Sequence, residues 1–310
     1  MGKPEPRVSS QKTNQLSFRE EACEHVQYQV SNNCAFITLN RAEKMNSLHR
    51  GMLVQISAYL DQAELDQEVR IIVIKGNQKA FCTGQDLGEL LDENPPTVEE
   101  LLKNYHDPIV LKISKSSKPV IAAVNGVAAG AGAVFAMACD IVVASDKASF
   151  IFGFSQIGLT SGSGGSYFLT RKVGAQKAAA LLMLGEKMNA QEAERIGMIY
   201  KVIPQDTFEA ELGVMVAKMA QLPALSLQLT KQLISHSSHN DLDAQILLER
   251  EAKCRAGNSP DFAEGVNAFI SKRKPVFNQN NGIPRPADCI TRININTNKE
   301  FLSKQSCITG

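Results

Sequence analysis

The sequence predicts an α/β fold with a largely parallel sheet. Three apolar runs, RIIVIKG, KPVIAAVNG and IVVAS, are too short for helices and have the composition of strands that are buried on both faces. Stretches with helical spacing or helical composition lie between these runs. Because strands that alternate with helices along a chain pair mainly in parallel, this order indicates an α/β architecture.

The elements of this fold follow one another along the chain. VQYQV and AFITLN flank the turn formers SNN and are predicted to be a pair of strands. Apolar residues recur at helical spacing in residues 47–67, which predicts a helix before the buried run that Gly76 ends. A second helix is expected at residues 98–114, and VAAGAGAVFAMACD is expected to form a helix of small residues. From Ala175 onward we expect mostly helices.

This pattern divides the chain into four parts. Residues 1–20 are polar and lack periodicity, so we expect a flexible arm. Residues 21–210 hold the α/β core, and residues 211–277 form a C-terminal helical region. Residues 278–310 are rich in Asn, Thr and Ser, which predicts a disordered tail.

The composition limits the classes of partner. With 33 basic and 32 acidic residues the net charge is +1, so bulk charge favours neither nucleic acid nor an anionic membrane. Seven scattered cysteines without a CxxC pair argue against a disulfide framework and a zinc site. No apolar run has the ~18 residues of a membrane span, and the N-terminal residues lack the pattern of a signal peptide. We therefore expect a cytoplasmic protein with no metal, nucleic-acid or membrane partner.

Two glycine-rich elements, AFCTGQDL and NGVAAGAGA, each follow a buried strand. Small residues there allow the backbone to approach a ligand closely, and peptide N–H groups at a turn or helix start stabilise a developing oxyanion. Either element alone is better explained by tight packing of a strand against a helix. Neither a GxGxxG dinucleotide motif nor a P-loop is present.

Five blocks in register resemble the crotonase superfamily of enoyl-CoA hydratases and isomerases. They are FCTGQDL, KPVIAAVNGVAAGAGAVFAMACDIVVAS, IGLTSGSGGSYFL, ALLMLGEKMNAQEAERIGMIYKVI and EGVNAFISKRKPVF, and the resemblance as a whole spans about residues 28–277. Within the family, FCTGQDL, GVAAGAGA, FSQIGL and the ending LERE to GNSPDFAEGVNAFISKR are similar to the ring-epoxyphenylacetyl-CoA isomerase branch. The resemblance implies a crotonase-type spiral of ββα repeats with a C-terminal helical region that forms a homotrimer or a dimer of trimers. It also implies an acyl-CoA thioester as partner, with coenzyme A as part of the substrate and no tightly bound cofactor.

The resemblance assigns an oxyanion hole to two backbone N–H groups, those of Gln85 and Ala131. Two preorganised N–H groups stabilise a thioester enolate, and the loss of one such donor typically costs ~100-fold in rate or more. Because main-chain groups act here, side-chain changes at these positions need not abolish the effect.

The acid/base positions of the family are empty in this sequence. The family's hydratases place two glutamates where this chain has Val134 and Phe154, and the similar isomerases place an aspartate where it has Gly162. Hydration needs a base for water and an acid for the α-carbon, so ordinary hydratase activity is the least supported chemistry.

Several polar residues are candidates to replace these groups. Glu89 is a candidate shuttle base at a helix start, whereas Asp86 is expected mainly to cap that helix. Thr160, Ser161 and Ser163 are able to bind a substrate or water, or simply to fill a polar turn.

The resemblance also implies residues that bind coenzyme A. Lys44 in NRAEKMNSL corresponds to a region that holds the nucleotide end, although a solvated surface lysine is a comparable interpretation. Phe269 and Lys272 correspond to positions that reach the adenine ring and ribose phosphate of the coenzyme A bound to a neighbouring subunit. For Phe269 a plain core residue is the alternative interpretation. The further cofactor-binding candidates lie beside the first glycine-rich element: Thr83, Asp86 and Leu87.

The histidines and Cys82 are assigned no role. His25, His49, His106, His236 and His239 have no partner at catalytic or metal-ligand spacing and are expected to be surface or satisfied residues. Cys82 is expected to be a small buried filler.

The sequence therefore supports two functions of different class. The first is a CoA-thioester isomerase or hydratase-like enzyme that transfers an α- or γ-proton, or rearranges a ring, with a displaced acid/base. The second is a catalytically silent acyl-CoA-binding protein that keeps the oxyanion hole. A protein that shares only the hydratase fold is a third interpretation.

Overall fold

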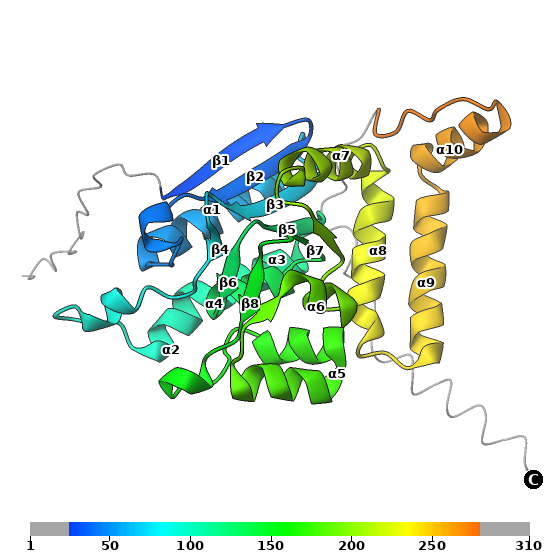
Figure 1. Cartoon of the computed structure of the whole chain (residues 1–310). Helices are drawn as coiled ribbons and strands as arrows, with labels where there is room; N and C mark the ends of the chain where they lie inside the picture. Colours follow the sequence, from blue (N-terminus) through cyan, green and yellow to red (C-terminus); the bar gives the residue numbers. More distant parts are fainter. Residues whose placement is uncertain (1–24, 280–310) are drawn as a thin grey trace, which may run out of the picture.

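The computed structural model describes residues 25–279 of the 310-residue chain, and these form two β-sheets with helices packed around them (Figure 1). The larger sheet has the strand order β1-β2-β3-β5-β7-β10 and the smaller β4-β6-β8-β9. The expected flexible arm, and the expected tail except for its first two residues, lie outside the described residues. The strands are β1 (Val26–Ser31), β2 (Cys34–Leu39), β3 (Ile71–Gly76), β4 (Ala80–Cys82), β5 (Val120–Val124), β6 (Val127–Ala129), β7 (Ile141–Ser145), β8 (Ser149–Ile151), β9 (Met188–Asn189) and β10 (Lys201–Ile203).

From β3 to β8, consecutive strands alternate between the two sheets, which produces a spiral. β3, β5 and β7 lie in parallel in the larger sheet, and each is followed by a short strand of the smaller sheet: β4, β6 and β8. The helices α3 and α4 then return the chain to β5 and β7, the next strands of the larger sheet. The α/β class and the spiral of ββα repeats are thus confirmed.

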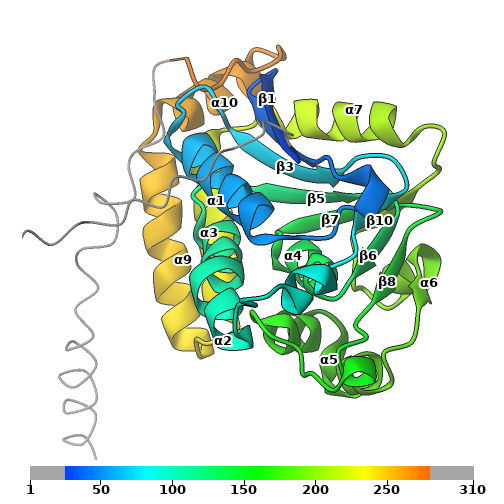
Figure 2. The same cartoon turned by 90° about the vertical axis from the view of Figure 1, so that its left-hand side faces the viewer.

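Helices cover both faces of the larger sheet (Figure 2). Alternate strand residues such as Val73 belong to one apolar cluster with Leu212 of α7, whereas Ile72 belongs to another with Met52 of α1 and Ile113 of α3. Burial on both faces explains why these strands are continuous apolar runs. The helices are α1 (Arg50–Leu65), α2 (Val98–Leu101), α3 (Asp107–Lys115), α4 (Ala131–Ala138), α5 (Gly165–Leu184), α6 (Ala190–Arg195), α7 (Phe208–Ala220), α8 (Ala224–Ser237), α9 (Leu242–Gly257) and α10 (Pro260–Ile270).

Short segments complete the chain: 3₁₀ turns η1 (Ala42–Lys44), η2 (Leu87–Leu91) and η4 (Ser155–Ile157), and a π-helical segment η3 (Leu102–His106). The single helix expected at residues 98–114 is therefore three consecutive segments, α2, η3 and α3.

The expectation of one helix for VAAGAGAVFAMACD is wrong at its start. Val127 to Ala129 form β6, and α4 begins only after Gly130, whose φ of 50° breaks the helical conformation. These three residues form a strand because they pair with β4 and β8 in the smaller sheet. Their own short apolar sequence does not reveal this second sheet. A second miss is β10, a strand within the region expected to be mostly helical.

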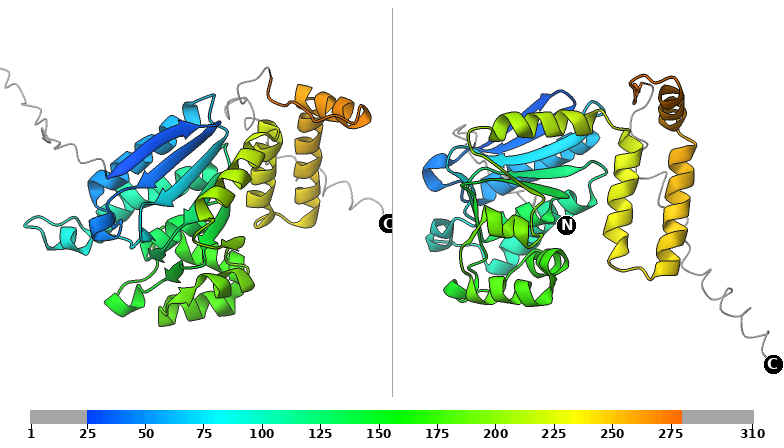
Figure 3. Two further views of the ribbon diagram at one scale, coloured as in Figure 1. Left: turned by 45° about the horizontal axis from the view of Figure 1, so that its top comes forward. Right: turned by 45° about the vertical axis from the view of Figure 1, so that its right-hand side comes forward.

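The C-terminal helices α8–α10 extend to one side of the sheets (Figure 3), and Lys231 of α8 joins them to the core through an ion pair of 2.8 Å with Asp140. α8 and α9 lie side by side, and α10 crosses the end of α9. Leu242 and Leu247 of α9 and Phe269 of α10 are exposed in the single chain. Within residues 25–279 no single helix has the length and hydropathy to cross a membrane. The helices α7 and α8 reach the required length and hydropathy only when they are taken together, and the chain bends by 102° between them.

Candidate active site

The two glycine-rich elements meet where β4 and β6 end. These strands pair in parallel, with Cys82 opposite Ala128. A Cβ at Gly84, whose φ is 93°, would lie 3.0 Å from the carbonyl oxygen of Ala129 and 3.2 Å from the amide nitrogen of Ala131. Only glycine combines this conformation with such a close approach of two backbones. The N–H groups of Gln85 and Ala131, which the sequence predicts to bind an oxyanion, therefore belong to two backbone segments in direct contact.

Neither the Gln85 nor the Ala131 N–H has a hydrogen-bond acceptor among residues 25–279. Ala131 is the first residue of α4, so its N–H lies before the intrahelical bonds begin. The Gln85 peptide is fixed from both sides, because the Gly84 carbonyl accepts from Leu48 N at 2.7 Å and Asp86 N donates to the Leu48 carbonyl at 2.8 Å. Two rigidly held, uncommitted N–H groups thus lie beside one another.

Apolar side chains occupy the space around these amides. Val134 is 1% exposed. The Phe154 ring lies 3.9 Å from where a Cβ of Gly130 would be, and the Leu102 side chain lies 3.0 Å from the corresponding point at Gly162. The Ser161 hydroxyl is buried and has no hydrogen-bond partner among the described residues. The surroundings offer no carboxylate at the three positions where the family's enzymes carry one.

Glu89, the sequence-predicted shuttle base, is held in an ion pair. Its Oε1 lies 2.7 Å from Arg50 Nε, and its Oε2 accepts from Gln85 Nε2 at 2.9 Å. The Arg50 N–H also donates to it at 3.2 Å, which places the carboxylate at the N-terminus of α1, where a negative charge is favoured. Both oxygens are therefore engaged in this structure.

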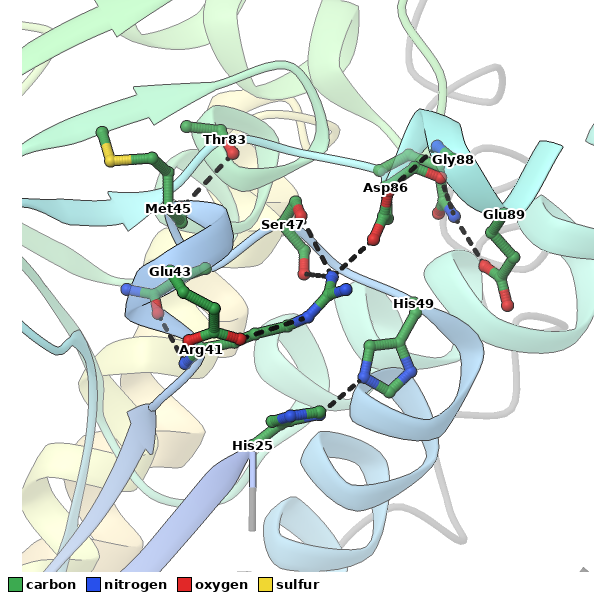
Figure 4. A network of polar contacts seen from close by, with 12 residues as sticks. His25, Arg41, Glu43, Met45, Ser47, His49, Thr83, Asp86, Gly88 and Glu89 are labelled. Carbon is green, nitrogen blue, oxygen red and sulfur yellow. Dashed lines mark hydrogen bonds and ion pairs between the residues drawn. The ribbon is translucent and has the colours of Figure 1, made fainter. Parts of the chain in front are cut away.

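Asp86 caps η2 as expected, since its Oδ1 accepts from Gly88 N at 2.9 Å. Its other oxygen lies 2.5 Å from Arg41 Nη1 (Figure 4). Burial alone would raise the pKa of Asp86, but the hydrogen bonds from Arg41 and Gly88 and the nearby positive charges bring the pKa below its usual value. Asp86 is thus an ionised, cation-paired group at neutral pH.

The residues predicted to bind coenzyme A near the first glycine-rich element lie on two segments, one with Thr83, Asp86 and Leu87 and the other with Lys44. Thr83 Oγ1 donates to the Met45 carbonyl at 3.2 Å, which ties the first glycine-rich element to the segment that carries Lys44 (Figure 4). Lys44 and Leu87 are exposed. Arg41, which the sequence argument did not single out although it lies in the same NRAEKMNSL motif, is the residue that joins these two segments.

Phe269 and Lys272 lie at the opposite end of the chain, on α10 and directly after it (Figure 1). Phe269 is 85% exposed, so the interpretation as a core residue is wrong for the single chain. With Phe262, Val266 and Phe277 it lines an apolar groove. The single chain does not bring these residues together with the amides of Gln85 and Ala131.

His106 corrects the expectation that the histidines are surface or satisfied residues. It is 3% exposed, and its Nε2 lies 2.8 Å from Gln85 Oε1. Because Gln85 donates its amide NH₂ to Glu89, its oxygen is the acceptor and His106 Nε2 carries the proton. Nδ1 is left without a hydrogen-bond partner, and burial lowers the pKa of His106 to about 4. The ring is therefore neutral at pH 7.

Asp107, the next residue, is a second site residue that sequence reasoning missed. Its Oδ1 accepts a hydrogen bond of 2.7 Å from Ser163 Oγ, and Ser163 directly follows Gly162. No lysine, arginine or histidine among residues 25–279 forms an ion pair with it. Its only sequence signal is an Asp-Pro pair within a predicted helix, which is typical of a helix start.

Two other expectations concern cysteine and metal. Cys82 is fully buried, as expected of a small filler, and burial raises the pKa of its thiol to about 12. In the described part of the chain no group of three His, Cys, Asp or Glu side chains is arranged to hold a metal ion.

Comparison with known proteins decides the family. The model of the family "Enoyl-CoA hydratase/isomerase" matches residues 29–280. The chain belongs to this family. The sequence-based recognition of the crotonase superfamily is confirmed.

Relatives and solved structures agree with this membership. The 1,2-epoxyphenylacetyl-CoA isomerase of Escherichia coli (strain K12) is 39% identical over 78% of this chain and 93% of its own length. The 2,3-dehydroadipyl-CoA hydratase of the same organism is 35% identical over 78% and 93%. An enoyl-CoA hydratase structure from Bacillus anthracis, 29% identical, covers 82% of this chain and 98% of its own with a TM-score of 0.78. These similarities include both an isomerase and hydratases.

Proposed function

We propose that the chain is an enoyl-CoA isomerase-type enzyme that stabilises a thioester enolate between the N–H groups of Gln85 and Ala131. The observation that carries the proposal is the contact between Gly84 and the Ala129–Ala131 backbone, which brings two uncommitted amides beside one another. In an apolar enclosure such donors stabilise a developing oxyanion far more than they would in water.

The apolar side chains favour proton transfer over hydration. Hydration requires a group that orients and deprotonates water, and Val134 and Phe154 offer neither a donor nor an acceptor. An enolate formed in this enclosure is instead available for reprotonation at another carbon. A shift of the double bond along the acyl chain, or a ring rearrangement, is the result.

The substrate is proposed to be an acyl-CoA thioester. Lys44, Thr83, Asp86 and Leu87 lie on the two segments that contact each other beside Gln85, which supports them as candidates for contacts to the CoA moiety. Phe269 and Lys272 are exposed at the far end of the chain and would serve the site of a neighbouring copy in a homotrimer or a dimer of trimers. Coenzyme A enters as part of the substrate, and the protein is proposed to act in the cytoplasm without a tightly bound cofactor.

A silent acyl-CoA-binding protein is the second candidate. The observation that favours it is specific: Val134, Phe154 and Gly162 leave all three acid/base positions of the family without a carboxylate. Binding would then survive because the backbone amides do not depend on those side chains.

A panel of CoA thioesters separates the two. The purified chain is incubated with short, long, aromatic and unsaturated acyl-CoAs, and both its melting temperature and the conversion of 3-enoyl-CoA to 2-enoyl-CoA are measured, with hydration of 2-enoyl-CoA as the comparison. Isomerisation that exceeds hydration, with stabilisation by the ligand, supports the proposal. Stabilisation without any turnover supports the silent binder. No stabilisation by any CoA ester at saturating concentration contradicts both.

A further inference from the structure

We infer that Asp107, at the start of α3, is the general base that the family's usual positions lack here; this inference rests on the proposed isomerase function. Three carboxylates lie around the Gln85 amide and the turn at Gly162: Asp86, Glu89 and Asp107. They differ in whether an arginine pairs with them, and this difference decides which of them is available to accept a proton.

Two of the three carboxylates are neutralised by arginines. Asp86 pairs with Arg41 at 2.5 Å, and Glu89 pairs with Arg50 at 2.7 Å. A carboxylate whose negative charge is held by a guanidinium and by backbone N–H groups is a poor proton acceptor, because protonation breaks those charge-assisted bonds. Both are better explained as structural anchors of the turns that carry the binding residues.

Asp107 has no such cation in the described part of the chain. Its side chain is partly buried, and the one hydrogen bond that it accepts comes from a neutral hydroxyl, Ser163 Oγ at 2.7 Å. That bond orients one carboxylate oxygen without neutralising the charge. The other oxygen accepts no hydrogen bond from residues 25–279, which leaves it available for a substrate proton.

The position of Asp107 matches the position of the missing group. Ser163 follows Gly162, where similar isomerases carry an aspartate, so a carboxylate from α3 approaches the turn that lost its own. The preceding residue, His106, is hydrogen-bonded at 2.8 Å to the side chain of Gln85. The start of α3 is therefore attached on one side to the proposed oxyanion donor and on the other to the acid/base turn.

His106 supports this arrangement as a positioning residue. The chain of hydrogen bonds from Arg50 through Glu89 and Gln85 fixes its Nε2 proton, and burial keeps the ring neutral. A neutral ring beside Asp107 does not form an ion pair with the carboxylate.

The proposed step balances without a co-reactant. The Asp107 carboxylate takes a proton from C2 of a 3-enoyl thioester, and the C–H electron pair enters a dienolate whose oxygen the Gln85 and Ala131 N–H groups bind. The carboxylic acid then returns the same proton to C4 as the double bond settles between C2 and C3. Leu102 and Val134 pack against Gly162 and Gly165 of this turn and offer no group that would orient a competing water.

The test compares wild type with Asp107→Asn, which keeps the shape and the acceptor for Ser163. Isomerisation of 3-enoyl-CoA and exchange of the C2 protons of a saturated acyl-CoA with deuterated solvent are both expected to fall by about 100-fold or more. The melting temperature and the stabilisation by a saturated acyl-CoA are expected to stay unchanged. Asp206→Asn, the same chemical change at an exposed turn between β10 and α7, is the matched control and is expected to keep full activity.

A rescue variant separates loss of a base from loss of structure. Asp107→Asn combined with Gly162→Asp returns a carboxylate to the turn, and it is expected to regain at least tenfold over Asp107→Asn alone. A Cβ at Gly162 meets only the end of the Leu102 side chain, so the turn accepts the change with a small shift of that side chain. No gain in the double variant would overturn the assignment of Asp107 to this position.

The outcomes distinguish the inference from the proposed function. If wild type isomerises and Asp107→Asn keeps more than a third of its rate, Asp107 is not the base and the isomerase proposal stands. If wild type binds acyl-CoA but shows neither turnover nor exchange, the isomerase proposal fails, and the role of Asp107 fails with it.

Discussion

Substitution of Gly84 by alanine tests the oxyanion hole directly, because this glycine is the point of contact between the two donor segments. Its φ of 93° is unfavourable for any L side chain, and its Cβ would press against the Ala129 carbonyl at 3.0 Å and the Ala131 nitrogen at 3.2 Å. The left-handed conformation costs an alanine roughly 1–2 kcal/mol. Relief of the contact requires the two segments to separate by a few tenths of an ångström.

Such a displacement changes catalysis more than stability. Removal of one oxyanion donor costs ~100-fold or more in kcat, and a shift of Ala131 relative to Gln85 misaligns at least one of the two. We therefore expect kcat for 3-enoyl-CoA isomerisation to fall at least ~100-fold in Gly84→Ala. The destabilisation corresponds to a melting temperature lower by ~2–8 °C for a chain of this size.

Gly197→Ala is the matched control for this substitution. Its φ of 76° imposes a comparable conformational cost, but its Cβ would meet nothing closer than a carbonyl oxygen at 3.8 Å and it lies in the turn before β10. We expect a similar loss of melting temperature with kcat unchanged. If Gly84→Ala keeps kcat within fivefold of wild type while its melting temperature falls like that of the control, the two amides do not act on one oxygen.

Three further predictions follow from the same geometry. Burial holds the pKa of His106 at about 4, below its usual 6.5, so between these values the unfolded chain binds a proton that the folded chain does not. The free energy of unfolding should fall by up to about 3 kcal/mol as the pH drops through this window, and urea denaturation of wild type and His106→Asn at several pH values should show that the variant lacks this part of the pH dependence. Glu89→Gln should reduce kcat by less than tenfold, because Glu89 acts as the partner of Arg50; a 100-fold loss in steady-state assays would instead make Glu89 the base. Phe269→Ser should weaken binding of free CoA, measured by calorimetric titration, with little effect on chain folding, since Phe269 is 85% exposed; a loss of folding stability typical of a core deletion would contradict this.

The sequence predicts the α/β class because the properties of its buried strands are local, whereas the spiral is expected only from the family resemblance. β3 and β5 are buried on both faces, and such strands are apolar throughout, which is visible without any knowledge of their partners. The glycine-rich composition after the buried strand is compatible with the close backbone approach at Gly84, but it is also compatible with tight packing of a strand against a helix, so composition alone does not reveal the contact. The short β6 is missed because three small residues have no pattern of their own and become a strand only by pairing with β4 and β8.

The acid/base group is hidden from the sequence for a different reason. Asp107 precedes a proline and has the appearance of a helix start, and its partner Ser163 lies 56 positions away. Only the docking of α3 across the turn that follows η4 brings the two together. His106 is missed in the same way, since its burial depends on the packing of the segment against Phe135 and Gln85.

Backbone and side-chain groups of this site are constrained to different degrees. The proposed oxyanion donors lie at the ends of two paired strands and against Gly84, so their positions are set by the backbone and not by any one side chain. A general base has only to reach one proton, and any element that borders the same turn is able to supply it. In this chain the start of α3 contacts the turn at Gly162 through the hydrogen bond between Asp107 and Ser163, so we propose that a carboxylate on either element meets the requirement. A family member that lacks carboxylates at the usual positions is therefore not inactive for that reason alone, and the proton-transfer step is to be sought among the unpaired acidic groups around its oxyanion hole.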